Sequence, residues 1–127
     1  MPKVSAAFFG WGTICVMLGM LWGMQMGGSE DFTMMPAHAH LNLLGWVTMA
    51  LYGTFYALSN SYSQNLAWAN FYISAAGVAI MIPSLAKYLG DQSDKSIIPV
   101  MIVGEVLTFA GLLTFGVSVF KELTRAR

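Results

Sequence analysis

Charged side chains are scarce in this chain. Only 9% of its 127 residues are Asp, Glu, Lys or Arg, and 57% are hydrophobic, whereas a soluble domain usually has about 25% charged residues. The shortage excludes an ordinary water-soluble domain and predicts that a lipid bilayer surrounds most of the chain. The formal net charge is zero and no basic cluster occurs outside the C-terminal tail, so nucleic acid is not an expected partner.

Cysteine is also rare. Cys15 is the only one, so no disulfide can form within the chain and cysteine usage does not indicate a redox compartment. Because Cys15 lies inside the first apolar run, we interpret it as a small buried side chain.

Four long apolar runs account for the composition. They cover about residues 5–26, 37–59, 66–86 and 97–120, and a helix of about 20 residues spans the ~30 Å hydrocarbon core of a bilayer. None alternates as a barrel strand would. With short connections, they predict an all-α integral membrane four-helix bundle, up-down-up-down, with residues 1–127 forming a single transmembrane domain. The first run is too long for a cleavable signal and is expected to stay as an anchor.

The distribution of basic residues predicts the orientation. An even number of spans puts both termini on one side, and that side has four basic residues against two on the other: Lys3, Lys121, Arg125 and Arg127 against Lys87 and Lys95. By the positive-inside rule, both termini are expected in the cytoplasm, with the protein in a bacterial inner membrane.

Small residues recur every four positions in the first run, at Cys15, Gly19, Gly23 and Gly27. Such a ladder lets another backbone approach closely, so it predicts helix packing either within the chain or between copies.

The chain has only two histidines. Both of them, His38 and His40, lie in the segment PAHAHLNLLGW at residues 36–46. Pro36 suits the first turn of a helix. Residues two apart on a helix point roughly 200° away from each other, so the two imidazoles are not expected to bind one ion.

The two histidines begin different stripes of the predicted helix. His38 continues through Asn42 and other polar, small or aromatic residues, which is typical of a face toward the bundle interior. His40 continues through Leu44 and Val47 on an aliphatic stripe. An imidazole surrounded by lipid is costly, so we expect His40 to be an axial ligand of haem b, with Leu44 and Val47 as an apolar wall. The alternative is an interfacial histidine that bonds headgroups or loop backbone.

The stretch His40-Leu41-Asn42-Leu43-Leu44, followed by Trp46, Gly53 and Tyr56, resembles the second transmembrane helix of the catalytic subunit of haem–copper oxidases, most closely the nitric oxide reductase and C-type oxidase branch. The resemblance implies that His40 ligates a haem b near the outer side, within a motif that includes Asn42. The Pro-Ala-His-Ala start also resembles the Thr-Ala-His-Ala of the mitochondrial-type branch, which would make His38 the ligand.

The resemblance covers only residues 36–58. The family's second low-spin ligand, its high-spin haem histidine and its three copper histidines have no counterparts among the two histidines of this chain. The chain therefore has no complete oxidase or reductase centre, and the sequence assigns it no reaction. A small haem protein in electron transfer, or in binding or sensing of a diatomic gas, is the function expected.

The second haem ligand is left open by the sequence. A two-fold homo-oligomer could supply His40 from each copy to one shared haem, or the chain could be an accessory subunit of a respiratory complex. Alternatively His38 and His40 serve different haems, Met34 or Met35 is the sixth ligand, or the iron keeps a free position.

Glu105 is the only carboxylate well inside the apolar runs. It lies roughly 12 Å along its predicted helix, at ~1.5 Å per residue, which is the expected depth of the histidines. A carboxyl at that depth predicts a functional role: to bond the far nitrogen of a ligand histidine or to carry a proton. A protonated acid bonded to a neighbouring backbone is the structural alternative.

Methionine supplies a rival site. The chain has ten methionines, and thioethers with imidazoles select Cu(I), so Met24, Met26, Met34 and Met35 beside the histidines favour an outer-face copper site. Methionine also fills gaps in apolar bundles. A cofactor-free structural subunit of a respiratory complex is the remaining alternative.

Overall fold

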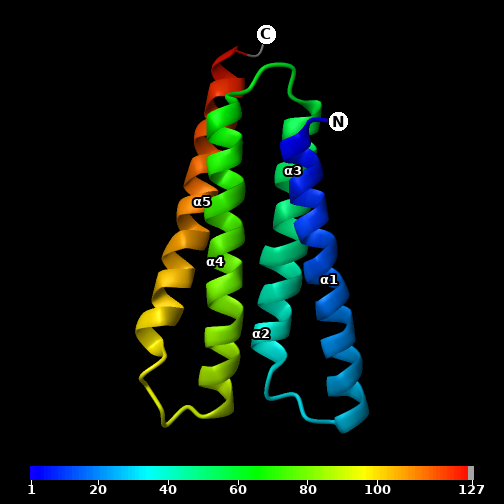
Figure 1. Cartoon of the computed structure of the whole chain (residues 1–127), viewed down its shortest axis with the longest axis vertical. Helices are drawn as coiled ribbons and strands as arrows, with labels where there is room; N and C mark the ends of the chain where they lie inside the picture. Colours follow the sequence, from blue (N-terminus) through cyan, green and yellow to red (C-terminus); the bar gives the residue numbers. More distant parts are fainter. Residues whose placement is uncertain (126–127) are drawn as a thin grey trace.

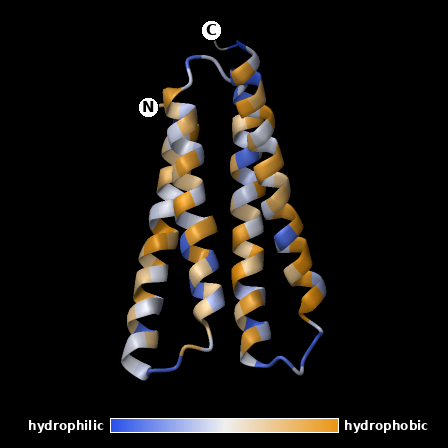
Figure 2. Cartoon of the chain, turned by 180° about the vertical axis from the view of Figure 1, so that it is seen from behind, coloured by the Kyte–Doolittle hydropathy of each residue, from blue (hydrophilic) through white to orange (hydrophobic). Residues whose placement is uncertain are grey.

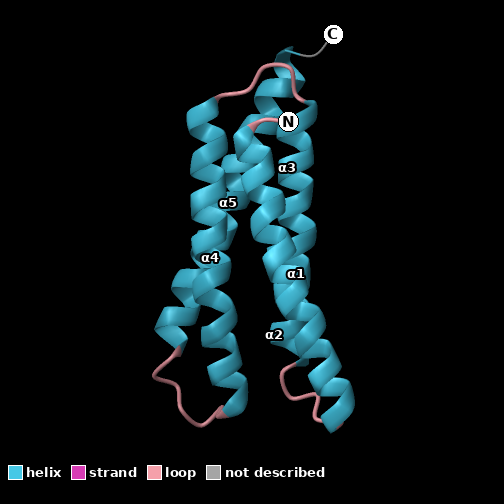
Figure 3. Cartoon of the chain, turned by 45° about the vertical axis from the view of Figure 1, so that its right-hand side comes forward, coloured by secondary structure: helices cyan, strands magenta, loops and turns pink. Residues whose placement is uncertain are grey.

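The computed structural model describes residues 1–125, which form four long helices and contain no strand (Figures 1 and 3). The second helix is continuous but has a π-helical middle section. The elements are α1 (Lys3–Ser29), α2 (Met35–His40), η1 (Leu41–Val47), α3 (Thr48–Leu58), α4 (Gln64–Gly90) and α5 (Ile98–Arg125). All four helices are long and apolar enough to cross a membrane, which confirms the predicted all-α fold and identifies a multi-pass membrane protein.

Local sequence explains where the helices begin and end. Pro36 lies in the first turn of α2, where its missing N–H costs nothing. Ser63 precedes α4, and its hydroxyl accepts a hydrogen bond from the Leu66 N–H at 3.3 Å. Glu30 ends α1 in the left-handed region, with φ 56°. The hydrophilic connections join helices that are hydrophobic along most of their length (Figure 2).

The helices pair as two antiparallel hairpins. One joins α1 to the helix formed by α2, η1 and α3, and the other joins α4 to α5. We call the end that holds the start of α1, the end of α5 and residues 59–63 the terminal end, and the opposite end, with residues 30–34 and 91–97, the loop end. The hairpins lie together at the terminal end and separate toward the loop end (Figures 1 and 3).

An aromatic cluster joins the hairpins in the terminal half. Phe8 of α1 lies 5.7 Å from Tyr52 and 5.8 Å from Tyr56, measured between ring centroids, and 5.3 Å from Phe71 of α4. Phe115 of α5 lies 4.5 Å from Tyr52. All four helices thus contribute a ring, and such pairs add about 0.5–1.5 kcal/mol each beyond the area they bury.

A buried polar network lies within the same half. The Tyr56 hydroxyl accepts a hydrogen bond from the Asn70 amide at 3.1 Å and bonds the Ser118 hydroxyl at 3.1 Å. Ser74 donates to the Asn70 side-chain oxygen at 3.0 Å. Because an unpaired polar group in an apolar interior is costly, the network requires α3, α4 and α5 to keep their present register.

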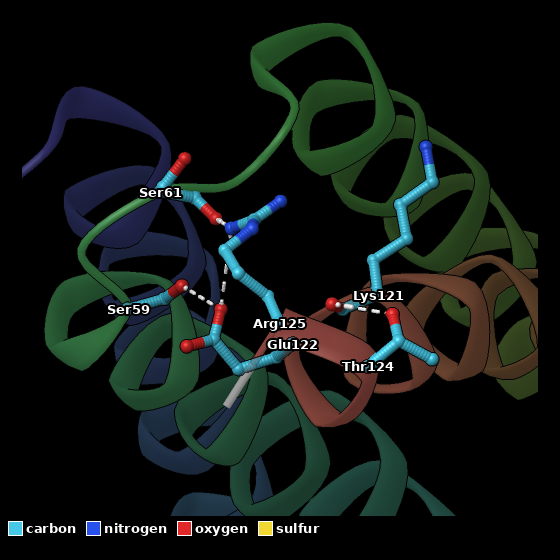
Figure 4. A network of polar contacts seen from close by, with 6 residues as sticks. All are labelled: Ser59, Ser61, Lys121, Glu122, Thr124 and Arg125. Carbon is cyan, nitrogen blue, oxygen red and sulfur yellow. Dashed lines mark hydrogen bonds and ion pairs between the residues drawn. The ribbon is translucent and has the colours of Figure 1, made fainter. Parts of the chain in front are cut away.

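A second network closes the surface of the terminal end (Figure 4). Ser59 donates to the Glu122 carboxylate at 2.8 Å, and Arg125 lies 3.7 Å from the same carboxylate. Arg125 also donates to the carbonyl of Ser61. The end of α5 is therefore bonded to the connection between the two hairpins.

The small residues of α1 pack against the second helix and form the seam between the two helices. This is one of the two predicted modes, packing within the chain. Gly19 faces Asn42 so closely that a Cβ would overlap the amide oxygen, and a Cβ at Gly23 would lie 3.0 Å from His38 Cε1. Gly27, in contrast, faces open space. The ladder thus packs within the chain over most of its length.

Glycines also form the seam between α4 and α5. A Cβ at Gly104 would lie 2.6 Å from the Met81 backbone nitrogen, and a Cβ at Gly77 would lie 2.6 Å from the Thr108 backbone nitrogen. Gly116, further along α5, has no atom within 4 Å of its Cβ position. Close backbone contact is therefore needed at Gly104 and Gly77 but not at Gly116.

Replacing Gly104 by Ala is expected to destabilise the protein, because the new methyl group meets backbone that cannot rotate away. Overpacking costs about 1–3 kcal/mol, which outweighs the gain of up to about 1 kcal/mol in helix propensity. The matched variant Gly116→Ala is expected to be neutral or stabilising. The free energy of unfolding of detergent-solubilised protein measures both, and equal effects would contradict the seam.

Candidate functional site

A groove of about 410 Å³ lies between the second helix and the α4–α5 hairpin. We call it the histidine groove. Its lining residues are His40, Leu44, Thr48, Met49, Tyr52, Ser74, Val78, Met81, Glu105, Thr108, Phe109 and Leu112. The walls are largely apolar, and the volume falls in the ~300–1,000 Å³ range of small-molecule and cofactor sites.

The π-helix η1 determines which residues share this groove with His40. At its end, the backbone N–H of Thr48 donates to the Leu43 carbonyl five residues earlier, and the Thr48 hydroxyl donates to the same carbonyl at 2.8 Å, as expected of a widened turn. His40, Leu44 and Thr48 line the groove together. Val47, which a regular helix would place on the same stripe, is 43% exposed and is not part of the lining.

The ring of His40 has a defined tautomer. Its Nδ1 lies 2.6 Å from the carbonyl oxygen of Pro36. A carbonyl oxygen only accepts, so Nδ1 carries the proton and Nε2 of the neutral ring keeps a free lone pair. A ring nitrogen that donates to a backbone carbonyl is the usual arrangement of a metal-ligating histidine.

His38 lies on the other side of the second helix. Its Nε2 is 3.2 Å from the Asn42 amide nitrogen, and its ring packs beside Gly23 of α1. The Nδ1 atom is buried without a hydrogen-bond partner among residues 1–125, as is the Asn42 amide oxygen. His38 and Asn42 therefore belong to the seam with α1, and the two imidazoles do not meet at one site.

Glu105 lines the histidine groove from α5, opposite the helix that carries His40. The two residues thus line one groove, and their common depth stays a prediction. Glu105 is exposed and makes no hydrogen bond or ion pair with any residue that the structure describes. Since Pro36 already bonds the far nitrogen of His40, the carboxyl of Glu105 does not fill that predicted role.

The other polar groups of the groove are mostly paired within their own helices. Thr108 donates to the Gly104 carbonyl at 2.8 Å, while Ser74 and Thr48 donate to Asn70 and Leu43. The groups left free to bond a ligand are the Nε2 of His40, the carboxyl of Glu105 and the hydroxyl of Tyr52. A ligand of this groove thus meets a nitrogen lone pair on one wall and an acid on the other.

The methionines expected to frame a copper site do not gather on one side of α1. Met26 is 2% exposed, and Met24, two residues earlier, is 71% exposed. Within residues 1–125, no group of three or more His, Cys, Asp or Glu side chains is placed to hold a metal ion. Copper at this end stays a prediction.

A second groove, of about 600 Å³, lies between α1 and α4 and was missed in the sequence. Its lining is apolar and includes Trp11, Trp22 and Pro83. Val78 lines both grooves. No local pattern signals this hollow, because it results from the separation of the two hairpins toward the loop end.

Comparison with known proteins adds no relative: the chain matches no protein-family model, no curated protein and no solved structure at a significant level. The chemistry of the histidine groove therefore rests on its own geometry.

The two histidines are expected to differ in their effect on the stability of the cofactor-free protein. His38→Ala leaves Asn42 unpaired at the seam with α1 and should cost about 1–3 kcal/mol. His40→Ala removes an exposed side chain and should change the free energy of unfolding by no more than about 0.5 kcal/mol. Denaturation of both variants in detergent measures the difference, and a larger loss in His40→Ala would contradict these positions.

Proposed function

We propose that the histidine groove holds haem b through His40 and that the protein serves in electron transfer. One observation carries the proposal: Nδ1 of His40 donates to the Pro36 carbonyl, which leaves Nε2 as a free ligand nitrogen in an apolar groove of cofactor size. The resemblance of residues 36–58 to a haem-binding helix of the haem–copper oxidases agrees with this choice of ligand. His38, whose Nε2 is engaged by Asn42, is the less suitable candidate.

The remaining residues of the groove fit a large flat apolar ligand. Leu44, Met81 and Phe109 supply hydrophobic walls on three helices, and burying apolar surface contributes roughly 25 cal/mol per Å². Lys87 and Lys95 lie near the loop end and suit the carboxylates of such a ligand. When bound, haem would supply one-electron chemistry at its iron; the chain supplies the axial nitrogen and excludes water.

The second axial ligand is proposed to come from another copy of the chain. No imidazole other than that of His40 lines the groove, and His40 is exposed at its edge. A two-fold axis brings the same residue of two copies together, so a homodimer sharing one haem would provide two imidazoles. If each chain instead holds its own haem, the iron keeps a free position and binding of a diatomic gas becomes the function.

The terminal end is proposed to face the cytoplasm of a bacterial cell. Lys3 begins α1, and Lys121 and Arg125 lie in the last turns of α5, all at that end, while Arg127 lies outside the described residues. Basic residues concentrate on the cytoplasmic side. The histidine groove would then lie near the outer surface, where a redox partner outside the cell membrane or another respiratory subunit can exchange electrons with it.

The visible spectrum of the purified protein tests the haem proposal. Wild-type protein is expected to show a Soret band and sharp reduced α and β bands, and His40→Ala is expected to lose them because the ligand nitrogen is gone. His38→Ala is the matched control and should keep them. A colourless protein that retains copper would favour the copper site instead, and a colourless, metal-free protein would favour a structural subunit.

Stoichiometry tests the proposed sharing of haem. One haem per two chains is expected, together with the mass of a dimer in detergent, because the groove offers a single imidazole per chain. The measurements are a pyridine haemochrome assay and light scattering. One haem per monomer, with a Soret shift on adding carbon monoxide, would replace electron transfer by gas binding.

A further inference from the structure

The basic residues near the end of α5 lie beside a small hollow at the terminal end, which we call the basic hollow. Lys121 and Arg125 line it from α5, and Ser61, Tyr62 and Ser63 line it from the connection that leads into α4. Lys121 and Arg125 are four residues apart, so their side chains share one face of the helix. The volume is only about 10 Å³, which is room for about one oxygen atom. The basic hollow therefore suits one oxygen of a group that lies mostly outside it.

Lys121 carries a charge that no described residue neutralises. Its ammonium group makes no hydrogen bond or ion pair with any residue among 1–125, and Figure 4 shows its side chain extending away from the pair formed by Glu122 and Arg125. The Glu122 carboxylate accepts a hydrogen bond from Ser59 and lies 3.7 Å from Arg125. Glu122 is thus already paired, and it does not line the basic hollow.

The other polar groups of the lining are able to donate hydrogen bonds. Arg125 has five N–H donors, and one of its nitrogens is used for the Ser61 carbonyl. The hydroxyls of Ser63 and Tyr62 each accept a hydrogen bond, from a backbone N–H and a side-chain amide of α4, which leaves the proton of each hydroxyl free to donate. Positive charges and hydroxyl donors without a carboxylate favour a negatively charged oxygen.

The length of α5 puts the basic hollow at the level of lipid headgroups. The helix has 28 residues and is about 42 Å long at ~1.5 Å per residue, whereas the hydrocarbon core is ~30 Å thick and the bilayer with its headgroup layers ~40–45 Å. Lys121 lies in the last turns of α5, outside the core. Val117, one turn nearer the bilayer centre on the same face, is an exposed apolar side chain. Below the charge of Lys121 there is therefore a surface for a hydrocarbon chain.

We propose that the basic hollow binds the phosphate group of an anionic phospholipid, with Lys121 and Arg125 pairing with its oxygens. A free phosphate ion offers the same oxygens, but the apolar surface at Val117 favours a molecule that carries hydrocarbon chains. Basic pockets between transmembrane helices are typical sites for anionic headgroups. The basic hollow shares no residue with the histidine groove, so it is independent of the proposed haem.

Native mass spectrometry of detergent-solubilised protein tests the site, with phosphatidylglycerol and phosphatidylcholine of equal chain length as probes. Wild-type protein is expected to retain phosphatidylglycerol in preference, because the choline group brings a positive charge toward Lys121. Lys121→Gln is expected to weaken the binding of phosphatidylglycerol about fivefold, since it removes one of the two charges that pair with the phosphate. Lys121→Arg keeps the charge and should keep the binding. Lys3→Gln, the matched control, removes the same charge from the same end but outside the basic hollow, and should keep the wild-type preference.

Three results would contradict the proposal. Equal weakening in Lys121→Gln and Lys3→Gln would show that overall charge, and not the basic hollow, attracts the lipid. Equal retention of the two lipids by wild-type protein would overturn the site without any variant, so the test stands even if a substitution disturbs the fold. Displacement of phosphatidylglycerol by added inorganic phosphate would assign the basic hollow to the free ion and overturn the lipid. None of these results changes the visible spectrum, which separates them from a failure of the haem proposal.

Discussion

The two hairpins meet in two clusters, an aromatic one around Phe8 and Tyr56 and a smaller one toward the loop end, and both grooves lie beside the smaller cluster. Within each hairpin, backbones meet along glycine seams such as Gly19 against Asn42 and Gly104 against Met81. Between hairpins, the main contact is the aromatic cluster around Phe8 and Tyr56. Toward the loop end the smaller cluster of Cys15, Leu41, Val78, Met81 and Ile82 joins the hairpins, and a groove lies on each side of it.

The π-helix converts this hollow into a candidate site. In a regular helix His40 would share a stripe with Leu44 and Val47. After the widened turns of η1, Thr48 lines the groove in place of Val47, while Leu44 stays beside His40 and Glu105 lies on the other wall. A π-helical segment costs backbone hydrogen-bond geometry and is frequent at functional sites, so its position immediately after the histidine agrees with a role for that residue. The same section keeps His38 and Asn42 packed on α1, which separates a structural imidazole from an available one.

Features encoded by local spacing could be predicted from the sequence. The four spans follow from long apolar runs, their antiparallel order from short connections, and the seam of α1 from small residues every four positions. Counting residues along two helices predicted a similar depth for His40 and Glu105, and both residues line the histidine groove. That Val47 lies outside the groove could not be predicted, because no residue pattern in the segment signals a π-helical turn. The second groove was missed for a related reason. The angle between the hairpins results from many contacts together, and no single residue of the sequence signals that angle.

Separation of the hairpins toward the loop end also gives the protein a wedge shape, narrow at the terminal end and broad at the other (Figures 1 and 3). A wedge occupies more area in one leaflet of a bilayer than in the opposite leaflet. Lateral pressure in the wider leaflet acts to push α4 and the second helix together. Val78, which lines both grooves, lies on α4 between them. A change in lipid composition or curvature that altered this pressure would alter the width of the space between His40 and Glu105.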